Sequence, residues 1–166
     1  MTLREELEKL QLPYPVVGKP VRGRGSHGVC VCVCSSLPEL ESHIQVLFEE
    51  SPAVMIEEFL SGEEATVTVM PPSKGWDEYW DLSIVTRFNH EEGVAPYNGV
   101  VAVTANSRVV SRKEERDRRY GEAVMGCVGV ARLLGVTAPI RIDVRRFRGG
   151  REQRFALFDV NMKPVS

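Results

Sequence analysis

The chain has 166 residues, of which 43% are hydrophobic and 27% are charged, a composition typical of a globular domain with a real core. The formal net charge of −2 and the pI near 6.0 provide no positive excess for binding nucleic acid or an anionic membrane. The first residues contain no apolar segment typical of a signal peptide, and no run approaches the ~18 apolar residues of a membrane span, so we expect a cytoplasmic protein.

Helices are expected where apolar residues recur at spacings of three and four. The first covers residues 2–10, and the second opens with a capping box formed by Ser36 and Glu39. The third covers residues 111–134 and ends at Gly135, and its mixed charges around Asp117 indicate a solvated face. The apolar stripe of the second helix is Leu40, Ile44, Leu47 and Phe48, and that of the third is Tyr120, Ala123, Val124, Cys127, Ala131 and Leu134.

Strands are expected where β-branched and apolar residues alternate or run together without a helical period. In the strand over residues 65–70, the alternating Ala65, Val67 and Val69 are predicted to point into the core. Strands mixed with helices in this order predict an α+β chain in two lobes. The expected strands cover residues 16–20, 29–34, 53–59, 65–70, 80–88, 100–104, 139–147 and 154–160.

Three cysteines, Cys30, Cys32 and Cys34, lie two residues apart and would point to one face of a strand. A zinc knuckle usually needs two cysteines separated by two residues on a turn, together with further ligands. The pattern therefore favours buried thiols, with a redox or metal role as the alternative.

The glycine-rich segment GRGSHG, residues 23–28, has the spacing of a dinucleotide-binding fingerprint. Such a fingerprint leads into a helix, whereas the segment here leads into the strand-like VCVCVC, so binding of NAD is not expected. Protein kinases carry their lysine on the strand after the loop, whereas Lys19 precedes it here. The remaining interpretations are a hairpin whose backbone N–H groups cover phosphates and a glycine hairpin without a ligand.

Four polar residues near the C-terminus are expected to converge on one hairpin. Arg141 and Asp143 share one face of a strand, and Asp159 and Asn161 share one face of the partner strand, with Gly149-Gly150 as the turn. Two carboxylates and an amide oxygen suit Mg²⁺, whereas each aspartate alone would be an ordinary solvated strand end.

The alternation in this hairpin is imperfect, because Phe155 and Leu157 share the face of Asp159 if the strand is regular. We expect both to pack farther from the polar residues. The segment MIEEFLSGEE, residues 55–64, places four glutamates around a short apolar linker. These acids indicate either a charged surface or a hinge that binds an adenine amino group and ribose hydroxyls.

Four motifs in order resemble the ATP-grasp superfamily and, within it, the D-alanine–D-alanine ligase branch. They are VVGKP followed by RGRGSHGV, then VMIEEFLSGEE, then IRIDV, then FDVNMKP, and they extend from about Val16 to Pro164. The resemblance implies an α+β fold in which two lobes clasp ATP. The N-terminal lobe would be residues 1–60, with the glycine-rich loop, and the C-terminal lobe residues 61–166, with the metal-binding hairpin.

The resemblance also implies the contacts with ATP. Lys19 and Arg87 would contact phosphates, Glu57 the adenine amino group and Glu64 the ribose. The loop that closes over the phosphates would contain Gly25, Ser26, His27 and Gly28, and the hinge that reads the adenine edge would be Glu58, Phe59 and Leu60. Arg141 would steady the transition state of acyl-phosphate formation. The ligands of Mg²⁺ (or Mn²⁺) would be Asp143, Asp159 and Asn161.

The implied activity is ATP-dependent ligation of a small-molecule carboxylate to an amine through an acyl phosphate. The family usually has glutamate where this chain has Asp159, and the RGRG loop also departs from the bacterial pattern, so D-alanine is not the expected substrate. Family ligases have further segments at both ends, so we expect a truncated form. The alternatives are a non-catalytic domain that binds ATP and Mg²⁺, a subunit completed by a protein partner, and an interaction module without nucleotide.

Overall fold

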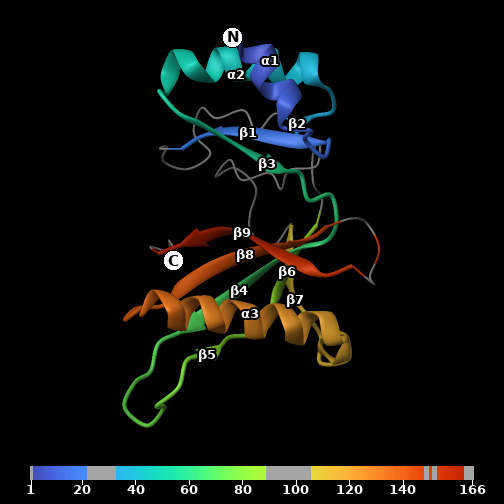
Figure 1. Cartoon of the computed structure of the whole chain (residues 1–166). Coiled ribbons are helices and arrows are strands. Elements are labelled where there is room, and N and C mark those ends of the chain that lie inside the picture. The colour runs from blue at the N-terminus through green and yellow to red at the C-terminus, as the bar shows by residue number, and fades with distance from the viewer. Residues whose placement is uncertain (1, 22–32, 89–105, 148–149, 151–152, 163–166) are drawn as a thin grey trace. The chain divides into compact units, whose positions relative to one another are not determined.

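The structure is a computed structural model that describes residues 2–21, 33–88, 106–147, 150 and 153–162. The chain divides into two compact units, Met1–Phe59 and Leu60–Ser166. Figure 1 shows that each unit combines an antiparallel sheet with helices on one face of it. No helix within the described ranges is both long enough and apolar enough to cross a membrane.

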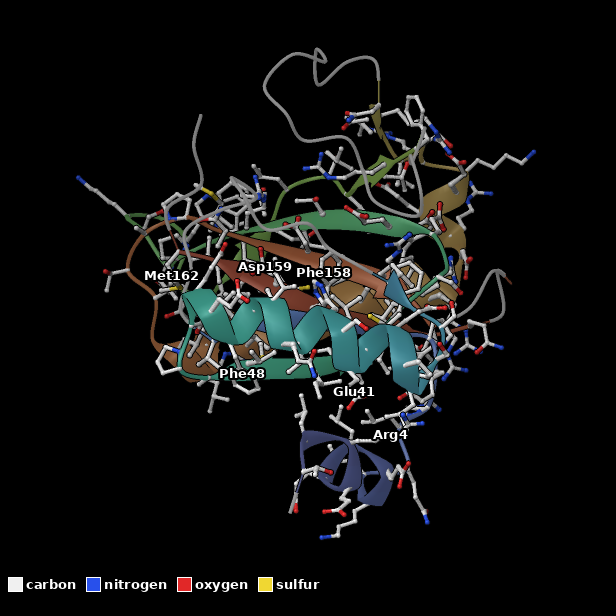
Figure 2. All side chains as sticks on the ribbon, turned by 90° about the horizontal axis from the view of Figure 1, so that it is seen from above. Arg4, Glu41, Phe48, Phe158, Asp159 and Met162 are labelled. Carbon is white, nitrogen blue, oxygen red and sulfur yellow. The ribbon has the colours of Figure 1, made fainter. Side chains whose placement is uncertain are left out.

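The first unit has a sheet in the order β2-β1-β3. Its elements are α1 (Leu3–Lys9), β1 (Val16–Pro20), β2 (Val33–Cys34), α2 (Leu37–Glu50) and β3 (Val54–Glu58). The helices cover one face of this sheet, where Val16 and Cys34 pack against Leu40 and Ile44 of α2. An ion pair between Arg4 and Glu41, at 3.7 Å, joins α1 to α2 (Figure 2).

Helix α2 passes close to β1 at Gly18, where an added Cβ would lie 3.2 Å from Cδ2 of His43. Nε2 of His43 also lies within hydrogen-bond distance of the Gly18 carbonyl oxygen, at 3.1 Å. His43 is therefore partly buried between α2 and β1. This contact fixes the helix over the strand that carries Lys19.

Helices α1 and α2 begin differently, and a capping box was predicted only for α2. Thr2 and Glu5 form a complete capping box at α1. At α2 the predicted capping box is wrong, because the Ser36 side chain makes no capping hydrogen bond and Glu39 instead accepts one from the Ser35 N–H, at 2.8 Å. Glu39 reaches one residue beyond the N-cap, so its carboxylate satisfies a different backbone donor.

The second unit has a sheet in the order β7-β6-β4-β8-β9, with β5 paired to the end of β4. Helix α3 lies along one face of this sheet (Figure 1). Its strands are β4 (Glu64–Met70), β5 (Trp80–Asp81), β6 (Val85–Arg87), β7 (Ser107–Val109), β8 (Ile140–Arg146) and β9 (Phe155–Asn161), and its helices are η2 (Glu114–Arg116) and α3 (Arg118–Leu134). The strand expected over residues 80–88 is two strands, because β5 and β6 pair with opposite ends of β4.

The core of the second unit lies between the sheet and α3. Ala65, Val67 and Val69 are fully buried, as their alternation predicts. They pack with Ile140, Ile142 and Val144 of β8 and with Tyr120, Ala123, Cys127 and Ala131 of α3. Leu134 and Phe48, expected in the apolar stripes, are 53% and 47% exposed, because each lies in the last turn of its helix.

The predicted helix over residues 111–134 is divided. The short helix η2 ends before Asp117, which has extended backbone and caps α3 by accepting a hydrogen bond from the Arg119 N–H, at 2.9 Å. The carboxylate of Asp117 also pairs with Arg146, at 3.2 Å. Asp117 is thus a structural residue and not part of a solvated helix face.

Several sequence expectations lie outside the described residues. These are the strand over residues 100–104, the first part of the strand over residues 29–34, and the placement of Cys30 and Cys32. Cys34 is fully buried in the first core, which agrees with the buried-thiol interpretation for that residue. Gly135 ends α3 in the left-handed conformation, with φ of 59°.

Candidate functional site

Polar residues cover the face of the second sheet that points away from α3. Because successive strand residues point to opposite faces, the neighbours of the buried Ala65 and Val67 must lie on the other side. The cross-strand register continues this face from strand to strand. It contains Arg87 on β6, Glu64, Thr66 and Thr68 on β4, Arg141, Asp143 and Arg145 on β8, and Asp159 and Asn161 on β9.

The C-terminal hairpin brings its four predicted polar residues together. Asp143 lies opposite Asp159, and Arg141 lies opposite Asn161, so all four share one face. Asp143 is 7% exposed, whereas Asp159 is exposed. The roles assigned to these residues from the resemblance stay predictions.

A β-bulge explains how this face stays polar. Asp143 pairs with Asp159 but Val144 pairs with Leu157, which leaves Phe158 as an extra residue (labelled beside Asp159 in Figure 2). The expectation that Phe155 and Leu157 share the face of Asp159 is therefore wrong. Phe155 packs 5.5 Å from the Tyr120 ring of α3, on the opposite face.

The carboxylate of Asp143 is held from two sides. Its Oδ1 accepts a hydrogen bond of 2.6 Å from the hydroxyl of Thr66 on β4. Its Oδ2 lies 3.3 Å from a terminal guanidinium nitrogen of Arg141. Sequence reasoning missed Thr66, although its place two residues after Glu64 on one strand was a usable signal.

Glu64 lies between two arginines. It is opposite Arg87 on one side and Arg145 on the other, with closest charged atoms at 3.6 Å and 3.9 Å. Arg145 also donates a 3.0 Å hydrogen bond to the Gly62 carbonyl, and burial lowers the pKa of its guanidinium, an effect that Glu64 opposes. Sequence reasoning missed Arg145, although it follows Asp143 by two residues and so shares its face.

The predicted nucleotide residues of the first unit lie on and beside its sheet. Lys19 and Glu57 point away from the helices and form an ion pair of 2.5 Å, with each side chain about one third exposed, at 32% and 37%.

The predicted hinge residues follow at the end of this sheet. Glu58 is exposed at the end of β3, and the Phe59 N–H donates to the Pro15 carbonyl, at 2.9 Å. Leu60 begins the second unit. The loop residues Gly25, Ser26, His27 and Gly28 lie outside the described ranges.

Next to the polar face lies a buried network centred on Arg146, which is 1% exposed. Its guanidinium donates to Glu63 at 3.0 Å, to Asp117 at 3.2 Å and to the Gln153 carbonyl at 2.8 Å. The Tyr120 hydroxyl donates to the other oxygen of Glu63, and burial together with this bond raises the pKa of Tyr120 to about 12. This network fixes the residue immediately before Glu64.

The donor set on the hairpin fits a hard divalent cation. Among the residues that the structure describes, no group of three His, Cys, Asp or Glu side chains is arranged as a metal site. The candidate ligand set therefore has two carboxylates, those of Asp143 and Asp159, and its third member is the side-chain amide of Asn161 on the same face. Such a set suits Mg²⁺ that keeps waters and takes further oxygens from a phosphate ligand.

Residues 2–164 match the model of the family described as "D-ala D-ala ligase C-terminus". The chain belongs to this family. Among curated members, the D-alanine–D-alanine ligase of Thermotoga petrophila is 28% identical over 81% of this chain and 45% of its own length. That of Phocaeicola vulgatus is 27% identical over 99% of this chain and 47% of its own length. The chain thus spans slightly less than half the length of these ligases.

Solved structures show the same fold. The D-alanine–D-alanine ligase of Bacillus anthracis complexed with ATP aligns with a TM-score of 0.65 and 19% identity, over 99% of this chain and 44% of that one. An ADP complex of N5-carboxyaminoimidazole ribonucleotide synthetase aligns with a TM-score of 0.68 and 17% identity, over 98% of this chain and 38% of that one. The D-alanine ligase family member described here therefore has the α+β ATP-grasp fold that its motifs predict.

Proposed function

We propose that this chain binds Mg²⁺·ATP and forms the nucleotide-binding part of an ATP-dependent carboxylate–amine ligase. The observation that carries the proposal is the polar hairpin face, where Arg141, Asp143, Asp159 and Asn161 meet through the cross-strand register. The family match over residues 2–164 supports the same class of reaction. A cytoplasmic location and small-molecule substrates belong to this proposal.

The proposed nucleotide contacts follow from the residue types. Glu64 would accept hydrogen bonds from ribose hydroxyls, and Glu57 would accept one from the adenine amino group. Lys19 and Arg87 would bind phosphate oxygens, for which cationic donors are suited. Glu58, Phe59 and Leu60 would form the adenine-reading hinge, and Gly25, Ser26, His27 and Gly28 the loop over the phosphates.

Asp143, Asp159 and Asn161 would hold the magnesium ion. When bound, the ion would neutralise charge on the phosphate oxygens. Arg141, paired with Asp143, would then direct its guanidinium toward the transferred phosphoryl group.

In the proposed reaction, an oxygen of the substrate carboxylate attacks the γ-phosphorus, and the bond to the oxygen of the ADP leaving group breaks. The products of this step are an acyl phosphate and ADP. An amine then attacks the acyl carbon, inorganic phosphate leaves, and the amine nitrogen loses a proton. Lys19, Arg87 and Arg141 would contribute by positioning the reactants and stabilising developing charge, so no side-chain nucleophile is needed.

A second candidate function is binding of Mg²⁺·ATP without turnover, or turnover only with a protein partner that supplies more of the substrate site. The observation that favours it is the coverage, since this chain matches 45% and 47% of the two ligases. Both candidates use the same nucleotide site, so they differ only in the chemistry that follows binding.

A trapping assay separates the two candidates. The chain is incubated with Mg²⁺·ATP, a panel of carboxylic acids and hydroxylamine, which converts an acyl phosphate into a hydroxamate. We expect hydroxamate and ADP to form in equal amounts with the correct acid, and Arg141→Met to lower the rate roughly 100-fold. Arg132→Met, at an exposed ion pair on α3, is the matched control. Binding of ATP without hydroxamate for any acid would favour the second candidate, and an unchanged rate in Arg141→Met would contradict the role of Arg141.

A further inference from the structure

Thr66 and Asp143 form a buried hydrogen bond between strands β4 and β8, although they are 77 residues apart in the sequence. They are cross-strand partners in the register, and both are 7% exposed. The distance of 2.6 Å from Oγ1 to Oδ1 is short, as expected for a hydroxyl that donates to a carboxylate. The hydroxyl therefore has a defined partner and a defined direction.

The two oxygens of Asp143 have different partners. Oδ1 accepts from Thr66, whereas Oδ2 faces Arg141 at 3.3 Å. An ionised carboxylate offers about four lone-pair positions, so these two contacts orient the group and leave acceptor capacity for a cation. Asp159, directly opposite, is exposed.

We propose that Thr66 is a positioning residue, whose hydroxyl holds the Asp143 carboxylate in the orientation that a divalent cation requires. This proposal rests on the proposed function, because it assumes that Asp143 is a metal ligand. A ligand that is already oriented loses less conformational freedom when the ion binds, so the ion binds more tightly. Partners that orient a ligand in this way typically account for a 10- to 100-fold difference in metal affinity, an approximate range.

Three substitutions at Thr66 distinguish the effect of its hydroxyl on metal binding from the effect of the rest of its side chain. Thr66→Val removes the donor and keeps the branched shape, Thr66→Ala removes the donor without adding a methyl group, and Thr66→Ser keeps the donor. The matched control is Thr86→Val on β6. Thr86 is also a buried strand threonine, 3% exposed, but it lies opposite Ala65 and therefore on the α3 side of the sheet.

The test measures binding of the preformed Mn²⁺·ATP complex to the protein by calorimetric titration, because free ATP would itself bind the ion. We expect Thr66→Val and Thr66→Ala to weaken Mn²⁺·ATP binding by about 10-fold or more. Thr66→Ser and Thr86→Val should keep the wild-type affinity for the complex. A second titration, with ATP and a chelator so that no metal contributes, should give similar nucleotide affinity for all variants, whereas general structural damage would lower it.

The outcomes distinguish this proposal from the proposed function. If the wild type binds Mn²⁺ with ATP and Thr66→Val binds it equally well, the role of Thr66 is wrong while the metal site stands. If Thr66→Ser is as weak as Thr66→Val, the hydroxyl is not the feature that matters, and the proposal is again wrong. If the folded wild type binds no Mn²⁺·ATP, both proposals fail together. Should Thr66→Val not fold, Thr66→Ala and Thr66→Ser decide the result.

Discussion

Asp143 on β8 and Asp159 on β9 are direct cross-strand partners, so two carboxylates face each other on one side of the sheet. Like charges in this position destabilise an antiparallel pair. Thr66 and Arg141 stabilise the charge on Asp143. A divalent cation bound by both carboxylates would remove the remaining repulsion. The facing pair would therefore lower the stability of the fold when the ion is absent and would bind the ion when it is present.

The first prediction concerns this repulsion. Without divalent ions, Asp159→Asn should raise the free energy of unfolding by about 0.2–1 kcal/mol, because it removes one of two facing charges. Urea unfolding in the presence of a chelator measures the change. Asp77→Asn, at an exposed position between β4 and β5, serves as the control and should have no effect. A loss of stability in Asp159→Asn would show that the facing carboxylates do not repel each other.

The second prediction concerns Lys19, which pairs with Glu57 at 2.5 Å. Lys19→Met should change the free energy of unfolding by less than about 1 kcal/mol, because the pair is partly exposed. It should weaken ATP binding roughly 10- to 100-fold, the effect of losing a hydrogen bond to a charged phosphate. Calorimetric titration with ATP measures the affinity, and Lys74→Met in the exposed loop after β4 is the control. Equal affinities in the two variants would remove Lys19 from the phosphate site.

The third prediction concerns the buried guanidinium of Arg146. The double variant Glu63→Gln with Asp117→Asn removes both carboxylates that pair with this buried cation at 3.0 Å and 3.2 Å, so it should lose about 3 kcal/mol of stability. Adding Arg146→Met should restore part of that loss, because no buried charge then remains. Urea unfolding of the three proteins measures both steps.

The order of stabilities decides the interpretation of this network. If the triple variant is less stable than the double variant, the contacts of Arg146 with the Phe155 ring, 4.3 Å away, and with the Gln153 carbonyl outweigh the charge. That result would contradict an electrostatic role for Glu63 and Asp117.

The fourth prediction concerns the pH dependence of stability. The hydrogen bond from the Arg119 N–H, with the nearby charge of Arg146, holds the pKa of Asp117 below its usual value of 3.8. Because the folded pKa is depressed, the carboxylate stabilises the fold above pH 3.8, and this stabilisation is lost as the pH falls through the folded pKa. The stability difference between wild type and Asp117→Asn should therefore shrink on acidification.

Unfolding in urea across the acidic range provides the measurement. Asn retains a capping side chain, so the Asn variant isolates the charge, whereas Asp117→Ala should lose about 1 kcal/mol more because the helix cap is also removed. A difference between wild type and Asp117→Asn that does not vary with pH would contradict the depressed pKa.

Much of the fold could be predicted because its signals are local. The strand bounds of β1 match the prediction, and the alternation of Ala65, Val67 and Val69 identified the buried face of β4. The two-residue spacing of Arg141 and Asp143 likewise predicted a shared strand face, and family resemblance predicted the ATP-grasp fold. These features need no knowledge of distant contacts.

The missed features depend on residues far apart in the chain. The bulge at Phe158 turns Phe155 toward α3 and Asp159 away from it, and no local pattern shows that one strand residue is unpaired. Arg146 would be expected at the surface from its charge, but its partners Glu63 and Asp117 are 83 and 29 residues away. Thr66 meets Asp143 only because β4 and β8 are neighbours in the sheet.

In the proposed function, the hairpin carboxylates would bind ATP through magnesium. Thermal unfolding of wild type and Asp159→Asn, each with and without Mg²⁺·ATP, tests it most directly, with Asp77→Asn as the matched control. At ~100 times the dissociation constant the ligand should add about 2.7 kcal/mol, which corresponds to a rise of roughly 5 to 10 °C in the unfolding temperature. We expect this rise in wild type and Asp77→Asn, only with magnesium, and its loss in Asp159→Asn. No rise in a folded wild type, or the same rise in Asp159→Asn, would contradict the account.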